Sequence, residues 1–209
     1  MLFVLPSLIA GFLASAVLII AIGAQNLFVL RQGLRREHVG VIVLFCSFSD
    51  MLLIALGVGG MGAFLAAIPQ LASAATLAGA AFLTWYGIKA LRRVALRDAM
   101  VAEDLPGITL GRALLTAAAF TYLNPHVYLD TMLLMGTIGS ARPVELRPFF
   151  VIGAAAASFV WFASLGFGAR LFAPVFARPV AWRVLDACVG GGMLVLAGLL
   201  VRHSVSIML

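Results

Sequence analysis

Asn124-Pro125-His126-Val127-Tyr128-Leu129-Asp130-Thr131 is a polar stretch inside a long apolar run, and Gly23-Ala24-Gln25-Asn26 is a second such stretch nearer the N-terminus. Hydrocarbon offers an unpaired polar group no water to bond, so each stretch must be buried in protein or line a wet cavity. Asn can cap a helix start, and Pro at the first helical position sacrifices no hydrogen bond. We therefore predict helix breaks at Gly23 and at Asn124 and Pro125.

The composition around these stretches is that of a membrane protein. Of 209 residues, 64% are hydrophobic and only 11% are charged, and the mean hydropathy is +1.14. Such values are typical of polytopic membrane proteins, whose spanning helices need about 20 apolar residues each. We predict an all-α polytopic membrane protein with six transmembrane helices, at about 5–29, 39–62, 68–90, 111–138, 149–173 and 180–201.

The basic residues are unevenly distributed between the connections of these six helices. The net charge of +6 is no sign of a nucleic-acid partner here, because the positive-inside rule explains where the charges lie. The odd-numbered connections hold most of them: Arg31, Arg35, Arg36, Lys89, Arg92, Arg93, Arg97, Arg112, Arg170, Arg178 and Arg183. The even connections and the tail hold Arg142, Arg147 and Arg202. We expect the odd-numbered loops in the cytoplasm and both termini outside. The orientation of the first helix is the least constrained part of this topology, because no charged residue precedes it.

A polar linker at 92–109 divides this single membrane domain into a first repeat at about 1–91 and a second at about 110–209. A three-helix unit used twice must be inverted, and such inverted repeats build the substrate sites of many secondary transporters. Internal similarity supports a repeat, since several residues of the first half fall in order on residues of the second. Asn26 falls on Asn124, Ser49 on Ser158, Leu83 on Leu194 and Gly87 on Gly198. Because glycine and leucine are abundant, coincidence stays the alternative.

Two acidic residues lie deep in predicted spans, Asp50 in the second and Asp130 in the fourth. A carboxylate at that depth costs about 2.5–3.5 kcal/mol on insertion scales and usually faces a partner, a cavity or a proton path. Both are candidates for binding a cation and for proton coupling. Their partners would be a cationic substrate, a proton, or Arg31 if that side chain turns inward. The alternative is structural bonding to Asn or Thr on a neighbouring helix.

The polar stretches supply the remaining candidate binding residues: Gln25, Asn26, Asn124, Tyr128 and Thr131. Tyr128 follows Asn124 by four residues and would share its helical face, while Thr131 adjoins Asp130. A restarted half-helix points free amides and a positive dipole end inward, which suits the α-carboxylate of an amino acid. Pro125 could instead merely kink its helix, with Asn124 bonding to a neighbour. No metal-ligand spacing and no nucleophile with a base is evident, so we do not expect an enzyme.

Three motifs, taken together, resemble those of the LysE-type lysine and arginine exporters, including the arginine exporters known as ArgO. They are Gly23-Ala24-Gln25-Asn26 with the following Val29-Leu30-Arg31-Gln32-Gly33, then Ser49-Asp50, and then the stretch from Leu123 to Thr131. The resemblance implies a bacterial inner-membrane exporter of basic amino acids, driven by the proton motive force and without a cofactor. It also implies that Asp50 and Asp130 are the family's paired intramembrane aspartates.

Two other functions stay open on the sequence. Exporters of neutral amino acids, other small solutes or cations could share this fold. A membrane thiol-disulfide relay would use Cys46 and Cys188, but neither lies at a predicted helix break. The sequence also leaves open the depth of Arg31 and the number of subunits, a homo-oligomer included.

Overall fold

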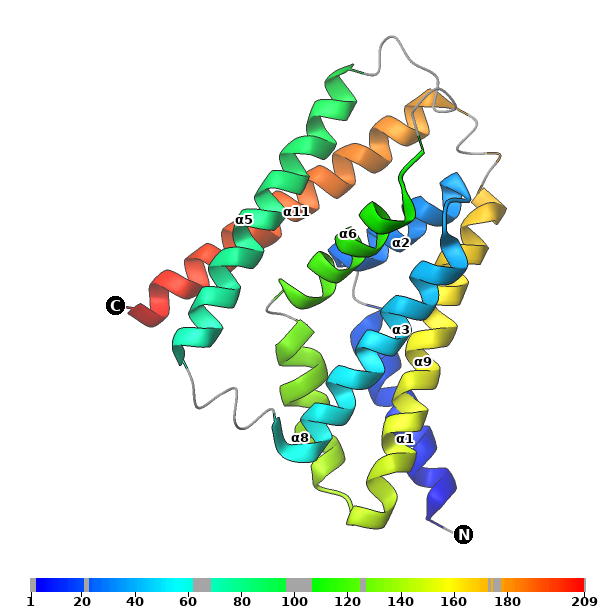
Figure 1. The fold of residues 1–209 in the computed structure, drawn as a ribbon, viewed down its shortest axis with the longest axis vertical. Helices are drawn as coiled ribbons and strands as arrows, with labels where there is room; N and C mark the ends of the chain where they lie inside the picture. The colour runs from blue at the N-terminus through cyan, green and yellow to red at the C-terminus, as the bar shows by residue number, and fades with distance from the viewer. Residues whose placement is uncertain are drawn as a thin grey trace.

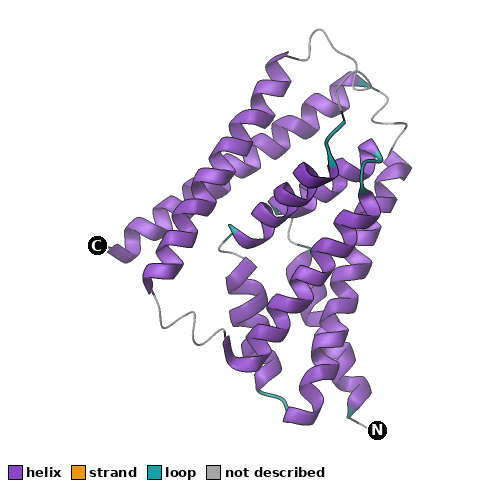
Figure 2. Cartoon of the chain, viewed as in Figure 1, coloured by secondary structure: helices purple, strands orange, loops and turns teal. Residues whose placement is uncertain are grey.

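A computed structural model of the chain describes residues 3–20, 23–61, 69–96, 107–124, 127–172, 174 and 178–208. All regular structure in these ranges is helical (Figure 2). Pro125, one of the predicted helix-break residues, lies outside the described residues. The all-helical class agrees with the prediction from composition.

The helices follow one another in two runs separated by the predicted linker. The first run comprises α1 (Val4–Ile19), α2 (Ala24–Arg35), α3 (Val39–Leu56), the π-helical η1 (Gly57–Met61) and α5 (Pro69–Leu96). The second run comprises α6 (Leu110–Tyr122), the π-helical η3 (Tyr128–Leu134), α8 (Met135–Ser140), η4 (Val144–Leu146), α9 (Arg147–Gly168), η5 (Ala169–Phe172) and α11 (Pro179–Met208). Because α5 continues to Leu96, this helix extends into the predicted linker.

Three stretches in the described part of the chain are long and apolar enough to cross a membrane. They are Val39–Gly60, Val144–Leu171 and Val180–Leu199, and the bent pair of α1 and α2 counts as a fourth if it is one span. This is a multi-pass pattern, as predicted. The full set of six predicted spans is not reached by this measure.

Glycine brings α1 and α9 into direct backbone contact. A Cβ atom on Gly11 would collide with the carbonyl of Phe150, and one on Gly153 would collide with the carbonyl of Leu8. Small residues at such positions let helices approach closely, which is how membrane helices gain van der Waals contact where lipid offers no hydrophobic drive. Helix α9 also packs along α3, so it forms the centre of this side of the molecule (Figure 1).

The antiparallel pair of α5 and α11 lies on the other side, with α2 and α6 between the two groups (Figure 1). An aromatic cluster links them. The Phe120 ring of α6 lies 5.6 Å from that of Phe28, 5.0 Å from that of Phe82 and 4.8 Å from that of Tyr86, between ring centroids. These rings join α2, α5 and α6 into one apolar core.

Both polar stretches lie where helices end and restart. Helix α1 ends at Ile19, Gly23 is extended (φ −102°, ψ 175°), and α2 begins at an angle of 85° to α1. Helix α6 ends at Tyr122, Asn124 is outside any helix, and η3 begins at Tyr128. The two interruptions therefore place non-helical backbone inside the bundle, on different runs of the chain.

Candidate functional site

The two interrupted segments face one cavity of about 300 Å³. Six of the residues predicted to bind substrate line it, together with Gly23: Gln25, Asn26, Asp50, Asn124, Asp130 and Thr131. The remaining lining residues are Ser15, Leu18, Ile19, Ile54, Val127, Met135, Phe162 and Leu196. Ligand pockets are commonly 300–1,000 Å³ and mostly apolar with a few placed polar groups. This cavity has that character and is of a size for a small molecule.

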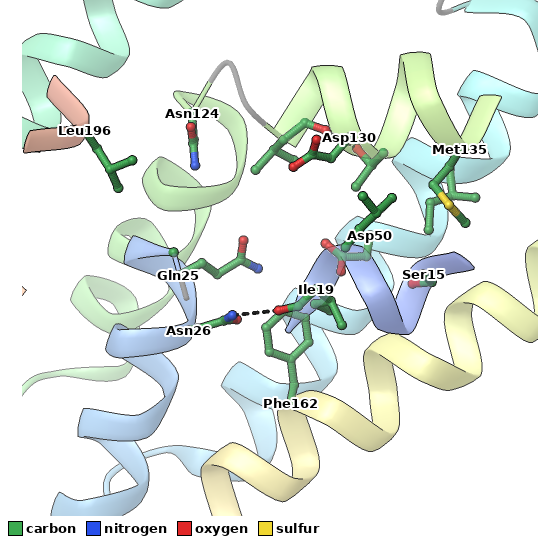
Figure 3. A pocket seen from close by; sticks show the side chains of 15 residues that line it. Ser15, Ile19, Gln25, Asn26, Asp50, Asn124, Asp130, Met135, Phe162 and Leu196 are labelled. Carbon is green, nitrogen blue, oxygen red and sulfur yellow. Dashed lines mark hydrogen bonds between the residues drawn. The ribbon is translucent and has the colours of Figure 1, made fainter. Parts of the chain in front are cut away.

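The first turn of α2 gives the cavity two amide side chains. Asn26 Nδ2 donates to the carbonyl of Ile19 at 2.8 Å and so satisfies an acceptor left free at the end of α1. Gln25 is only 8% exposed, and its amide nitrogen has no hydrogen-bond partner among the described residues. Its side chain does have the Cys46 thiol, a weak acceptor, as a neighbour. Figure 3 shows the Gln25 amide extending into the cavity, so a donor is available to a ligand there.

Asp50 and Asp130 bring two carboxyl groups to the same cavity (Figure 3). Asp50 comes from α3 and is 6% exposed, and its Oδ2 accepts a hydrogen bond from Ser158 Oγ of α9 at 2.9 Å. Asp130 comes from η3 and is half-buried, with Thr131 beside it donating its hydroxyl to the Val127 carbonyl. No Lys, Arg or His is among the described residues that line the cavity. The described part of the lining therefore includes two acidic side chains and no basic one.

Tyr128 does not line the cavity, although the sequence places it on the face of Asn124. Its hydroxyl donates instead to the carbonyl of Tyr122 at 2.7 Å, at the end of α6. The prediction assumes a continuous α-helix, in which residues four apart are neighbours. The chain is not helical at Asn124 and η3 has π-helical geometry, so that spacing does not apply.

Arg31 turns inward and pairs with an acidic residue of α11 that does not line the cavity. Its guanidinium lies 2.9 Å from Asp186 Oδ1 of α11, and the two side chains are 7% and 1% exposed. Assigning Arg31 to a cytoplasmic connection is therefore wrong, because the residue lies within α2 and is buried. The sequence analysis did not single out Asp186. This residue is an acidic side chain inside the last predicted span, so the argument that singled out Asp50 also applies to it.

Ser158 is a second residue that sequence reasoning did not assign to the site. The internal similarity between the two halves aligns Ser158 with Ser49, and Ser49 is next to Asp50 in the sequence. This alignment was a weak indication that Ser158 could lie near the site. In the structure Ser49 accepts a hydrogen bond from the Tyr122 hydroxyl at 2.9 Å. Within the described part of the chain no group of three or more His, Cys, Asp or Glu side chains is placed to hold a metal ion.

Comparison with known proteins identifies the chain. The sequence profile described as "LysE type translocator" matches residues 16–204, nearly the whole length. This protein belongs to the LysE type translocator family. A translocator moves its cargo across a membrane without changing it chemically, so this LysE family member is a multi-pass membrane transport protein and not an enzyme.

Curated relatives support the same family. Proteins of Mycobacterium bovis and of two strains of Mycobacterium tuberculosis are each 45% identical to this LysE family chain over 188 residues, covering 90% of the chain and 93% of the relative. They carry provisional names as amino-acid transporters. No solved structure matches the chain significantly.

The thiol-disulfide relay loses its support. Cys46 is buried in α3 and Cys188 is exposed on α11, and both are free thiols. A relay passes electrons through a cysteine pair, whereas a LysE family protein is a translocator. Membership of a translocator family therefore favours transport over a relay.

Proposed function

We propose that this protein exports basic amino acids, arginine or lysine, across the bacterial inner membrane and is driven by the proton motive force. Family membership and the names of the mycobacterial relatives support an amino acid as cargo. The charge of the cargo is inferred from the cavity.

The observation that carries the proposal is the pair of carboxyl groups at a cavity whose described lining contains no basic side chain. A cationic side chain would be attracted to these carboxyl groups, whereas a neutral amino acid offers them no opposite charge. The other end of an amino acid is an α-carboxylate, which suits the start of α2 and the amides of Gln25, Asn26 and Asn124. In this proposal one aspartate binds the side-chain cation while the other exchanges a proton.

In this proposal the chain forms six spans in two inverted repeats, and each repeat contributes one broken helix to the site. Supporting this, one half contributes the break between α1 and α2 and the other the break between α6 and η3, and both face the cavity. Rocking of one half against the other would then expose the cavity to each side in turn. We place the basic connections in the cytoplasm, because positive charge is retained there.

Reconstituted vesicles loaded with labelled arginine provide the test. We expect efflux to be stimulated by a proton gradient, and we expect Asp50→Asn and Asp130→Asn each to lower its rate at least about tenfold, the loss of roughly 1.4 kcal/mol of cargo stabilisation. If both variants keep the parent's efflux and its response to the gradient, the roles given to the two aspartates are wrong.

Competition decides the class of cargo. Unlabelled lysine should inhibit arginine efflux, and threonine and homoserine should not. Inhibition by the neutral amino acids alone would favour the alternative of a neutral amino-acid exporter, and inhibition by none would favour another small solute or cation.

A further inference from the structure

The amide nitrogen of Gln25 is a buried hydrogen-bond donor that the fold leaves without an acceptor. Gln25 lines the cavity and is 8% exposed, and its Nε2 has no hydrogen-bond partner among the described residues. The neighbouring Cys46 thiol is only a weak acceptor. Because a buried donor without a partner is unfavourable, a ligand that brings an acceptor to Gln25 Nε2 is stabilised in this cavity.

The start of α2 adds further donors at the same wall of the cavity. The residue that precedes the helix is Gly23, which has no side chain to cap the amides of the first turn. Those amides have no acceptor within their own helix, and the positive end of the helix dipole lies with them. Since Gly23, Gln25 and Asn26 all line the cavity, this wall favours an anionic group.

The carboxyl groups of Asp50 and Asp130 lie at the same cavity (Figure 3), but attraction to them does not separate an amino acid from an amine. Agmatine, the amine that remains when arginine loses its carboxylate, carries two cations and no anion. Charge alone therefore favours agmatine over arginine at two carboxyl groups. Cadaverine stands in the same relation to lysine. A transporter for basic amino acids needs a further contact to exclude these amines.

Gln25 provides such a contact, because the amines carry no acceptor. Ammonium and guanidinium groups are donors only, so Gln25 Nε2 would stay buried and unpaired with either amine in the cavity. Sites built to hydrogen-bond one group of a substrate reject an analogue without that group by about 10⁴–10⁵ in the strongest cases. The carboxylate of arginine, by contrast, accepts charge-assisted hydrogen bonds from Gln25 and from the first-turn amides of α2.

Resting on the proposed function, we propose that Gln25 makes the α-carboxylate of the cargo a requirement for transport, so that the protein excludes the decarboxylated amines of arginine and lysine. The two ends of the cargo are then recognised separately. The aspartates attract its side-chain cation, and the start of α2 accepts only a cargo that also carries a carboxylate.

The test compares the efflux of labelled arginine with that of labelled agmatine from reconstituted vesicles. Gln25→Met keeps an unbranched side chain of similar length and removes the donor. We expect the parent to move arginine at least about tenfold faster than agmatine. The variant's ratio of arginine to agmatine efflux should be at least about tenfold below the parent's, which corresponds to 1.4 kcal/mol of lost discrimination.

Gln32→Met is the matched control. Gln32 is buried in the same helix, at 4% exposure, and is not among the residues that line the cavity, so this variant should keep the parent's ratio. Gln25→Glu gives a second measurement. Its carboxylate repels the carboxylate of arginine and attracts a second cation, so this variant should move agmatine faster than arginine.

Competition in the parent needs no variant, and it keeps the proposal open to refutation if the variants do not fold. Excess unlabelled lysine should inhibit the efflux of labelled arginine, and the same excess of agmatine should not. Equal inhibition by the two compounds would mean that the carboxylate is not required.

The outcomes separate the two proposals. If the parent moves no basic amino acid, the proposed function fails and the role of Gln25 fails with it. If the parent moves arginine, three results overturn the assignment of Gln25 alone: inhibition by agmatine as strong as by lysine, an unchanged ratio in folded Gln25→Met or Gln25→Glu, or an equal fall in the ratio for Gln32→Met.

Discussion

Ser158 holds the Asp50 carboxylate from a neighbouring helix, and this single contact sets how the acid faces the cavity. Hydrogen bonds to charged groups contribute about 1.5–3 kcal/mol, and this one is 2.9 Å long and buried. Ser158→Ala should therefore raise the half-saturating arginine concentration on the order of tenfold, because the carboxylate loses its fixed orientation. The measurement is arginine efflux over a range of internal concentrations.

Ser164→Ala is the matched control on the same helix. The Ser164 hydroxyl is exposed and donates to the Val160 carbonyl of its own helix at 2.6 Å, so its loss should leave the half-saturating concentration unchanged. A Ser158→Ala variant that lowers only the maximal rate would contradict a role in positioning Asp50.

At the scale of helices, the contact between α1 and α9 depends on glycine at two positions. Gly153→Ala would push a methyl group into the Leu8 carbonyl, and overpacking of this kind costs about 1–3 kcal/mol. Gly168→Ala, in the same helix, meets nothing within 4 Å and should be neutral or stabilise by about 0.5–1 kcal/mol, since alanine favours the helix. Thermal unfolding in detergent should show a lower midpoint for the first variant only. Equal shifts for both would mean that the close approach does not matter for stability.

The helices also show why some site residues could be predicted and others could not. Gln25, Asn26, Asn124, Asp50 and Asp130 are recognisable because a polar group in an apolar run must find a partner or a cavity, and the structure places all five at one cavity. Local pattern alone suffices for that argument.

Tertiary contacts are beyond such a pattern. Ser158 is 108 residues from Asp50 and Asp186 is 155 residues from Arg31, so nothing in the neighbouring sequence pairs them. The π-helical turns of η1 and η3 are equally hidden, because apolar residues specify a buried helix without fixing its hydrogen-bond register. That is why the expected shared helical face of Asn124 and Tyr128 does not form.

At the scale of the whole molecule, the proposed orientation can be tested with two single cysteines. Gly107 precedes α6 and lies beside Glu37 of the basic connection after α2, Ala141 directly follows α8, and both are exposed. The start of α6, on the side of the basic connections, and the end of α8 lie toward opposite ends of the molecule (Figure 1). With the exposed Cys188 changed to Ser and the buried Cys46 retained, a membrane-impermeant maleimide should label Ala141→Cys in intact cells. It should label Gly107→Cys only after the cells are opened, since we place that end in the cytoplasm. The reverse pattern would invert the topology.

The order of synthesis gives the pair of Arg31 and Asp186 a further consequence. Translation delivers Arg31 in the second helix, and its carboxylate partner follows 155 residues later in the last one. At about 5–20 residues per second the ribosome needs roughly 8–30 s to cover that distance. During this interval the nascent chain carries the Arg31 guanidinium before the Asp186 carboxylate has been made. Insertion of that last helix completes the pair, so a chain truncated before α11 lacks this connection between its second and last helices.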